Sequence, residues 1–421
     1  MARLAIIGAG WAGLAAAVHA TLRGHTVALF EMAAAPGGRA RSVVHDAQVL
    51  DNGQHILIGA YRETLALMRQ VGVDPERVLH RQPLAMVDVQ GHGLALRPGP
   101  APLAFLRAVW SHPNWPLRDR LTLLRAGAGW AAARFRAPAG STVQALCSRL
   151  PPTVLRELIE PLCVAALNTP ASEASAQVFL TVLRDGLFGE RGCADLLLPR
   201  RPLGELLPEP AWAWLGSRGV SLAPRTRIQV LVREPQGGWS VQGTRFDGVV
   251  LACSAHEAAR LALPHAPGWA AQLPTLRHEP IVTVVMDCPG ARLAHPMVSL
   301  TEGPAQFAFD HGALGANPGR FTFVVSGAAP WLEAGSGPLA EAVMAQAGSA
   351  LVGRPDAAAR PTLRACIAER RATFRCVAGL LRPPQVIEPG LVAAGDYVAG
   401  PYPATLEGAV RSGMSAAGHF G

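Results

Sequence analysis

The chain contains no lysine. All 38 of its basic residues are arginines, so no step of its chemistry can use a lysine amine as a base, a Schiff-base nucleophile or an anchor for a catalytic water. The abundance of alanine indicates codon bias in a GC-rich genome as the origin of this absence. The chemical exclusion holds whatever the origin.

Paired cysteines and long apolar runs are also missing. The seven cysteines include no CxxC pair and their number is odd, so no metal site or disulfide framework is predicted, and the reduced thiols of a cytoplasmic protein are expected. No run of eighteen apolar residues escapes interruption by charge, Gly or Pro, so no membrane-spanning helix is predicted. The mean hydropathy of +0.22 excludes intrinsic disorder, and 421 residues predict two or three structural units.

The N-terminal residues carry the pattern of a dinucleotide-binding unit. A short apolar run (4–7) predicts a buried strand, GAGWAG (8–13) a turn, 14–22 a helix and 26–30 a second strand. Gly8 permits the tight turn, Gly10 lets the backbone approach a pyrophosphate, and Gly13 lets the helix pack closely on the sheet.

The start of this helix and the end of the second strand complete the predicted nucleotide site. The helix N-terminus, at Trp11 and Ala12, supplies amide donors and partial positive charge. Glu31, eighteen residues after Gly13, is placed to accept from a ribose hydroxyl, and its charge disfavours a 2′-phosphate. The pattern therefore predicts FAD or NAD rather than NADP; the alternative is a glycine-rich turn in an unrelated α/β domain.

The next loop favours FAD. The sequence PGGRARS (36–42) resembles the GGRxxS element of the flavin amine oxidase and carotenoid desaturase superfamily. The glycines, Gly37 and Gly38, bring the backbone close to a cofactor, and Arg39 can pair with a pyrophosphate. The resemblance implies that Gly38 and Arg39 contact FAD. Arg41 either does the same or is a solvated loop residue.

The C-terminal residues match the same superfamily. A strand-like run ends at Gly395 and Asp396, and a helix is predicted over 405–417. The resemblance implies that the Asp396 carboxylate binds the ribityl chain and that the helix N-terminus faces the pyrimidine end of the flavin. The alternative for Asp396 is a helix cap. The predicted cofactor contacts of this helix are Thr405, Glu407, Gly408 and Ala409, and in the middle of the chain Ile228 is expected to use its backbone.

The resemblance also implies an architecture. The fold class expected is α/β, with a Rossmann-type FAD-binding domain assembled from discontinuous segments and an α+β substrate domain like that of amine oxidases. Residues 1–84, 196–264 and 385–421 are expected to form the FAD-binding domain. Residues 85–195 and 265–384 are expected to form the substrate-binding domain with a helical cap.

Two further stretches narrow the resemblance. DNGQHILIGAY (51–61) and EPLCVAALNTP (160–170), together with the GGR loop and the Gly-Asp turn, closely resemble the squalene-associated FAD-dependent desaturases, better described as hydroxysqualene dehydroxylases of bacterial hopanoid synthesis. The resemblance covers essentially the whole chain. It implies hydride transfer from reduced flavin N5 to an allylic carbon of a C30 alcohol, giving squalene. The alternative is a carotenoid or polyene desaturase or an amine oxidase, although many amine-oxidising relatives use a Lys–water pair that this chain cannot supply.

The hydroxyl is a poor leaving group and needs a proton donor. His55 is the candidate donor and Asp51 the group that orients it or sets its charge, with Gly53 beside the flavin. The alternative is that Asp51 caps a turn and His55 bonds backbone or flavin. Tyr397 and Tyr402 are further candidate acids or cavity walls. Asn168 and Cys163 either line the substrate tunnel or are structural.

The partners follow from this chemistry. The substrate is a C30 isoprenoid alcohol, and the electrons come from an external donor, a reduced nicotinamide or a reductase, because no second dinucleotide fingerprint is present. Residues 105–136 carry three tryptophans, six arginines and one acid, which fits contact with anionic lipid at the inner membrane; the alternative is an amphipathic helix pair with solvated arginines. Spread charge and the lack of a known module exclude nucleic acid.

Overall fold

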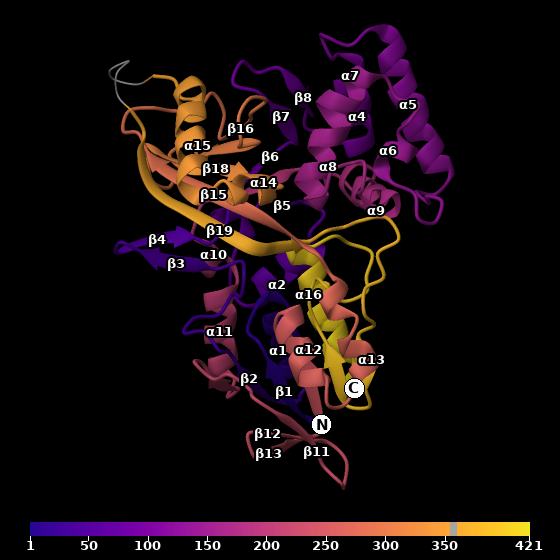
Figure 1. The fold of residues 1–421 in the computed structure, drawn as a ribbon, viewed down its shortest axis with the longest axis vertical. Helices are drawn as coiled ribbons and strands as arrows, with labels where there is room; N and C mark the ends of the chain where they lie inside the picture. Colours follow the sequence, from indigo (N-terminus) through magenta and orange to yellow (C-terminus); the bar gives the residue numbers. More distant parts are fainter. Residues whose placement is uncertain (354–359) are drawn as a thin grey trace.

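The computed structural model describes residues 1–353 and 360–421. The six residues outside this range fall within the second stretch expected for the substrate domain. Figure 1 shows a lower half that holds both termini and an upper half with a sheet on one side and a group of helices on the other. No helix in the described part of the chain is long and apolar enough to span a bilayer.

A six-stranded sheet forms the lower half. Its strands in spatial order are β10 (Ser221–Ala223), β2 (Thr26–Phe30), β1 (Arg3–Ile7), β14 (Gly248–Leu251), β21 (Leu391–Ala393) and β20 (Val386–Glu388). All neighbouring strands are parallel except the β20–β21 pair. Three stretches far apart in the sequence thus build one sheet, which confirms the predicted Rossmann-type fold from discontinuous segments.

Both faces of this sheet are covered, which explains why its strands are apolar without alternation. One face packs on helices, and the other on a three-stranded meander and two short helices. The first set is α1 (Trp11–Leu22), α2 (Arg62–Gln70), α11 (Pro208–Ser217) and α16 (Leu406–Ala417). The second is β11 (Leu231–Arg233), β12 (Trp239–Val241), β13 (Thr244–Phe246), α12 (Ala255–Ala262) and α13 (Pro267–Ala270).

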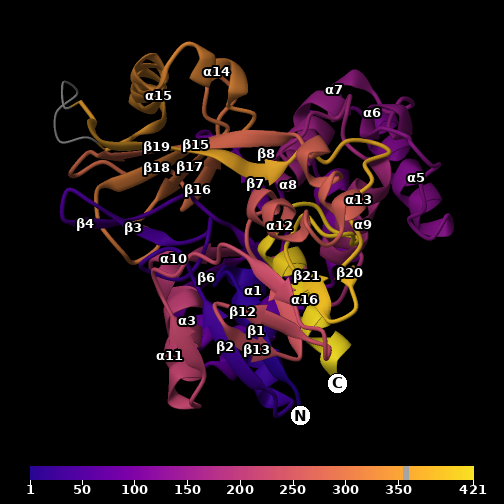
Figure 2. The same cartoon turned by 60° about the horizontal axis from the view of Figure 1, so that its bottom comes forward.

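A five-stranded antiparallel sheet lies in the upper half. In spatial order it contains β16 (Met297–Ser299), β17 (Phe307–Asp310), β18 (Arg320–Val325), β15 (His278–Asp287) and β19 (Thr362–Phe374). Figure 2 shows α14 (Ala329–Glu333) and α15 (Ser336–Ala350) above one face of it. The opposite face meets small β-elements of the N-terminal half. These are β3 (Ser42–His45), β4 (Gln48–Asp51), β5 (Leu57–Ile58), β6 (Leu79–Gln82) and β9 (Leu196–Pro199).

The remaining helices share a separate hydrophobic core beside this sheet. They are α4 (Ala101–Trp110), α5 (Leu117–Ala132), α6 (Val143–Leu146), α7 (Pro152–Val154), α8 (Glu160–Leu167) and α9 (Ala176–Leu187). The hairpin of β7 (Ala85–Val87) and β8 (Gly93–Ala95) leads into them, and α3 (Pro75–Val78) and α10 (Leu203–Leu206) are single-turn connectors. The chain thus places an apolar helical layer over the carboxyl side of the nucleotide-type sheet.

Candidate active site

Close backbone approaches build the turn between β1 and α1. Gly8 has a φ of +105°, and a Cβ there would lie 2.7 Å from the carbonyl oxygen of Ala252. A Cβ on Gly13 would overlap the carbonyl oxygen of Gly8. Both positions therefore require glycine, as the fingerprint predicts.

The N-terminus of α1 offers free donors to a ligand. No side chain caps α1, and its first internal hydrogen bond runs from the Leu14 amide to the Gly10 carbonyl over 2.9 Å. The amides of Trp11, Ala12 and Gly13 precede that bond, so the helix itself provides no acceptor for them. Three such amides at the positive end of a twelve-residue helix suit a phosphate.

The GGR loop lies directly against this turn. The Gly37 amide donates to the Ala9 carbonyl over 2.8 Å, and a Cβ on Gly38 would lie 3.2 Å from the Cα of Gly10. Trp11 stabilises this contact, because its buried indole Nε1 donates to the Ala40 carbonyl over 2.9 Å. The side chain of Trp11 is therefore structural, and only its amide can serve the cofactor contact predicted for it.

Glu31 holds the same turn. Its buried carboxylate accepts from the Ala9 amide over 2.7 Å and from the Ala33 amide over 2.8 Å. Each oxygen keeps a further lone pair, so acceptance from a ribose hydroxyl stays a prediction compatible with this geometry.

Arg39 and Asp396 bring the two ends of the chain together. The Arg39 Nη2 lies 2.6 Å from the Asp396 Oδ1, and its Nη1 donates to the carbonyls of Arg371 and Ala372. The Asp396 carboxylate raises the pKa of Arg39. Arg39 thus joins the Gly395–Asp396 turn to the edge strand β19. Arg41 instead donates to the Gly38 carbonyl of its own loop, which favours the loop reading for this residue.

The N-terminus of α16 corrects part of the cofactor prediction. Thr405 is its cap, accepting from the Gly408 amide over 3.0 Å, and the Ala409 amide donates to the Thr405 carbonyl. Because Gly408 and Ala409 already have acceptors within the helix, their amides are not available to a flavin. Only Leu406 and Glu407 leave first-turn amides for that purpose.

The side chain of Glu407 has a different task from the one predicted. Its carboxylate is 1% exposed and accepts from the Thr64 amide and hydroxyl, over 2.9 and 2.8 Å, and from the Glu63 amide. It thereby caps the N-terminus of α2, whose own cap residue Tyr61 makes no such bond. Arg411 balances the charge at 2.7 Å. A tertiary contact of this kind has no signal in the local sequence.

The motif at 51–55 lies beside the Arg39 loop, but the predicted pairing of its two titratable groups is wrong. The Asp51 Oδ1 accepts from the Ser42 hydroxyl over 2.8 Å and from the Leu203 amide over 2.9 Å. Burial raises the pKa of Asp51 to about 6. Asp51 therefore secures strand β3 and the start of α10 instead of orienting His55.

His55 is oriented by its own loop. Its Nδ1 lies 2.9 Å from the Gly53 carbonyl, and because a carbonyl only accepts, Nδ1 carries the proton and Nε2 is left for a ligand. Burial and the nearby Arg39 charge lower the pKa of His55, against the opposite effect of the Gly53 carbonyl. The neutral ring is thus the favoured form at neutral pH.

Thr283 is a candidate site residue that the sequence analysis did not identify. It lies on β15, 3% exposed, and its hydroxyl has no hydrogen-bond partner among the described residues. A Cβ on Gly53 would lie 3.9 Å from this hydroxyl and 3.4 Å from the His55 Cε1. The only sequence signal was a polar residue within the otherwise apolar run of that strand. A buried hydroxyl without a partner is costly, and a group bound near Gly53 would supply the missing partner.

Both candidate tyrosines have partners within the fold. Tyr397 is 4% exposed and packs in the core on the far face of the six-stranded sheet, with its hydroxyl 3.4 Å from the Leu251 carbonyl. Burial raises its pKa well above the usual range. This placement contradicts a role as proton donor to substrate. The Tyr402 hydroxyl donates to Asp185 over 2.8 Å, and burial raises its pKa to about 12.

Three other predicted positions are structural in their side chains. The Ile228 side chain is buried and its carbonyl accepts from Arg260 over 2.6 Å, so its amide is the group left for the adenine end of a cofactor. Asn168 ends α8 with a φ of +46° and bonds Thr373 and the Gly327 amide. Cys163 is buried and donates to the Thr169 carbonyl. The structural alternative holds for Asn168 and Cys163.

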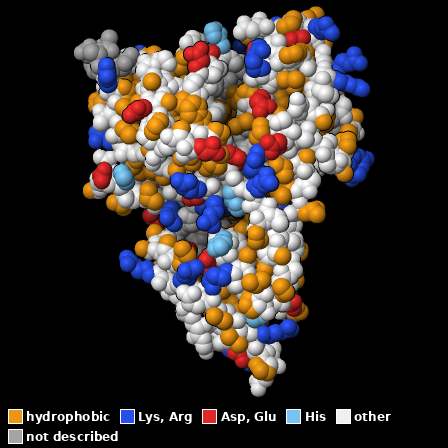
Figure 3. Space-filling model, in the orientation of Figure 1, with side chains coloured by type: hydrophobic (Ala, Val, Ile, Leu, Met, Phe, Trp, Pro, Cys, Tyr) orange, Lys and Arg blue, Asp and Glu red, His pale blue; other side chains and the backbone are white. Residues whose placement is uncertain are grey.

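The surface of the molecule is hollowed at its middle. Figure 3 shows this hollow between the lower and upper halves of the molecule, with basic and histidine side chains around it. The first-turn amides of α1, the close Gly10–Gly38 backbone approach and the unpaired Thr283 hydroxyl are groups that would hold a dinucleotide cofactor such as FAD. Within the described residues no cluster of His, Cys, Asp or Glu could hold a metal ion.

Comparison with known proteins decides the family. The model of the flavin-containing amine oxidoreductases matches residues 11–419. A hydroxysqualene dehydroxylase of Rhodopseudomonas palustris is 30% identical over 98% of this chain and 96% of its own length. The chain belongs to the flavin-containing amine oxidoreductases and, among them, to the hydroxysqualene dehydroxylase family. This membership confirms the FAD prediction and the expected enzyme class.

Other relatives sharpen this assignment. The hydroxysqualene dehydroxylase of Zymomonas mobilis is 27% identical over 98% of this chain and 97% of its own length. In contrast, a probable zeta-carotene desaturase of Synechococcus elongatus matches 17% of this chain and 15% of its own length, at 41% identity. The solved structure of an oxidoreductase from Methanosarcina mazei covers 98% of this chain and 99% of its own, with a TM-score of 0.73 at 16% identity, which shows a common fold.

Proposed function

We propose that this protein removes the hydroxyl group of hydroxysqualene reductively, giving squalene. What carries the proposal is similarity to hydroxysqualene dehydroxylases along nearly the whole chain. The polyene desaturase alternative rests on a match to about a sixth of it. The amine oxidase alternative lacks the lysine that many such enzymes use near the flavin.

The reaction sets clear demands on the chain. A C–O bond breaks, a proton turns the departing hydroxyl into water, and a hydride forms the new C–H bond. Bound FAD in its reduced form supplies the hydride. The protein must therefore exclude water, hold the allylic carbon near the flavin and bring a proton to the hydroxyl oxygen.

We assign His55 as the proton donor to the departing hydroxyl. Its Nδ1 is held on the Gly53 carbonyl, so Nε2 can bond the substrate hydroxyl and, in the charged ring, donate to it. Arg39 and burial make the charged form scarce at neutral pH, and donation returns the ring to its favoured neutral state. Thr283 is assigned a positioning role, because its hydroxyl has no partner and lies near Gly53, whose carbonyl holds His55.

The surroundings of the site complete the proposal. Residues 1–84, 196–264 and 385–421 form the FAD-binding domain, and 85–195 with 265–384 the substrate-binding domain, except that α13 and the residues up to Leu276 pack on the FAD-binding sheet. The electrons come from a separate reductase or a reduced nicotinamide. The protein works in the cytoplasm at the inner membrane, where residues 105–136 meet the bilayer that holds its C30 substrate and product.

A single-turnover experiment tests the reaction. The purified protein, loaded with FAD and reduced under anaerobic conditions, is mixed with hydroxysqualene in detergent, and the extract is analysed for squalene by mass spectrometry. We expect squalene to appear in step with flavin oxidation. Absence of squalene from the flavin-loaded protein, with oxidation of a carotenoid or an amine under air, would overturn the proposal in favour of the alternatives.

A further inference from the structure

The helices α4 and α5 expose apolar side chains that no part of the structure covers. On α4, Leu103, Leu106 and Trp110 are 50%, 43% and 53% exposed, and on α5, Leu117 and Leu121 are 55% and 44% exposed. Their spacings of three or four residues place them on one stripe of each helix. Each helix also buries an opposite stripe in the helical core. A second apolar stripe facing water marks an interaction surface.

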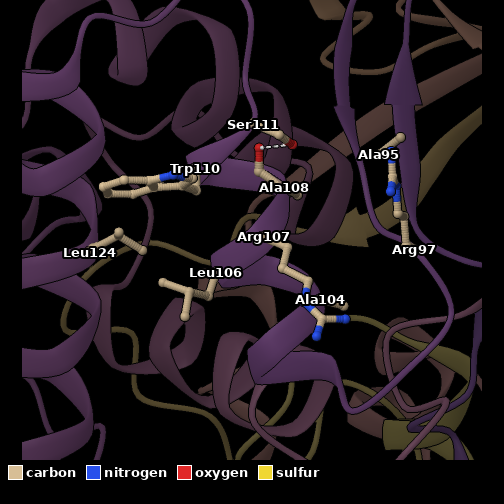
Figure 4. A pocket seen from close by; sticks show the side chains of 9 residues that line it. All are labelled: Ala95, Arg97, Ala104, Leu106, Arg107, Ala108, Trp110, Ser111 and Leu124. Carbon is tan, nitrogen blue, oxygen red and sulfur yellow. Dashed lines mark hydrogen bonds between the residues drawn. The ribbon is translucent and has the colours of Figure 1, made fainter.

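A cavity of about 580 Å³ lies along α4, lined by Leu106 and Trp110 of its stripe and by Leu124 of α5. Figure 4 shows the Trp110, Leu106 and Leu124 side chains together on one side, and the Arg107 and Arg97 side chains toward the other. Arg97 follows β8, so three elements form the walls. The cavity is thus amphipathic, with a hydrocarbon side and a basic side.

The charge around the cavity has one sign. Between Arg97 and Arg136 the sequence has one acid, Asp119, and it is 9% exposed. Arg97, Arg107, Arg118 and Arg125 are exposed, and none of them joins an ion pair with another described residue. Arg120 differs, since it donates to the carbonyls of Trp110, His112 and Trp115 and so fixes the turn between the two helices. A rigid hairpin with unpaired cations and exposed apolar groups complements an anionic amphiphile.

We propose that the cavity between α4, α5 and β8 binds one anionic phospholipid of the bilayer surface, with a hydrocarbon chain against Leu106, Trp110 and Leu124 and the phosphate on Arg97 and Arg107. This inference rests on the proposed membrane contact and names its lipid class and its place. The other exposed apolar residues, Leu103, Leu117 and Leu121, lie in the lipid interface, and the bound lipid fixes the orientation of the protein on the membrane.

Vesicle sedimentation tests the lipid class. The FAD-loaded full chain is mixed with vesicles of phosphatidylcholine alone or with roughly one-third phosphatidylglycerol. We expect the anionic vesicles to bind at least about tenfold more tightly, and the double variant Arg97→Glu/Arg107→Glu to lose most of that difference. The matched control Arg218→Glu/Arg233→Glu changes two exposed arginines outside the helical group by the same charge. Equal loss in both double variants, or no preference of the wild type, would overturn the proposal.

Fluorescence quenching tests the cavity itself. Phosphatidylglycerol with brominated acyl chains should quench tryptophan emission of the wild type, and Trp110→Phe should remove most of that quenching. Unchanged quenching in this variant would refute the assignment to this cavity. Squalene formation in detergent, measured on all the variants, separates the two proposals. If the lipid proposal alone is wrong, the variants and the wild type still form squalene. If the wild type forms no squalene, only the proposed reaction is contradicted.

Discussion

The flavin turn and the α4–α5 face are opposite solutions to the placement of polar and apolar groups. At Gly8 and Gly13 the backbone is packed so closely that a Cβ has no room, and the buried carboxylates of Glu31 and Glu407 have hydrogen-bond partners. On the α4–α5 face large apolar groups and arginines meet water. The groups of the first region have partners within the chain and leave only the cofactor site open. The exposed groups of the second region need a partner outside the chain. Substitutions should therefore cost cofactor and stability in the first, and surface binding in the second.

The largest difference between the two regions is expected when a helical glycine in each is replaced by alanine. Gly13→Ala places a Cβ onto the Gly8 carbonyl, and we expect loss of bound FAD with a destabilisation of about 1–3 kcal/mol. Flavin absorbance per protein and thermal unfolding measure both. The matched control is Gly129→Ala in α5, where a Cβ meets nothing within 4 Å and should stabilise by about 0.5–1 kcal/mol. Full FAD occupancy in Gly13→Ala would contradict the close approach.

Removal of His55 should affect turnover and not the cofactor. His55→Ala is expected to keep FAD and to lower the squalene-forming rate by about 10²–10⁴-fold, the usual contribution of a positioned acid. The exposed His45 on the β3–β4 hairpin provides the control, and His45→Ala should act as wild type. A near-normal rate in His55→Ala would remove this residue from the mechanism.

A substitution of Glu407 tests whether the FAD-binding region depends on a helix cap supplied from a distant part of the chain. Glu407→Gln turns an oxygen acceptor into an amide donor facing the Thr64 amide and hydroxyl or the Glu63 amide, and should cost about 1–3 kcal/mol of unfolding free energy. Urea titration measures it, with the exposed Glu341 on α15 changed to Gln as a control. Equal stability of both variants would mean that α2 does not need this cap.

The pH dependence of turnover should follow the His55 ring. Because burial and Arg39 lower its pKa, below the ordinary value of about 6.5, the donating form is lost as the pH rises through that lowered value. The rate should then fall by about tenfold per pH unit above the pKa and level off below it. The fall should be absent in His55→Ala. A flat profile of the wild type from mildly acidic to neutral pH would exclude the charged ring as the donor.

The smallest effect is expected on the exposed stripe. Leu121 and Leu123 lie two positions apart on α5 but are 44% and 1% exposed. Leu121→Ala should change the unfolding free energy by less than about 0.5 kcal/mol, whereas Leu123→Ala should cost about 2–5 kcal/mol. Thermal unfolding compares them, and a large loss in Leu121→Ala would mean that this stripe is covered within the chain.

Much of the flavin region could be predicted because its requirements are local. A strand, a tight turn and a helix follow one another within about twenty residues, and the glycines are dictated by the backbone of that short unit. The catalytic reading was less successful. Asp51 and His55 are neighbours in sequence, yet Asp51 bonds Ser42 and Leu203 on other elements. Tyr397 follows the Gly-Asp turn, but its side chain enters the core. Closeness in the sequence says little about where two side chains point, because successive side chains leave the backbone on different sides.

The sequence by itself determined the dinucleotide-binding unit and the exclusion of lysine chemistry, since these depend on residue types and on short-range spacing, and its resemblance to a known family added FAD and the discontinuous fold. Only the tertiary structure decided which groups complete the site. It alone joined Arg39 to Asp396 across 357 positions, moved Glu407 from the flavin to the cap of α2, and left the Thr283 hydroxyl unpaired. The physical reason is that buried polar groups must find partners wherever the packed chain brings them, and that pairing is a property of the whole fold.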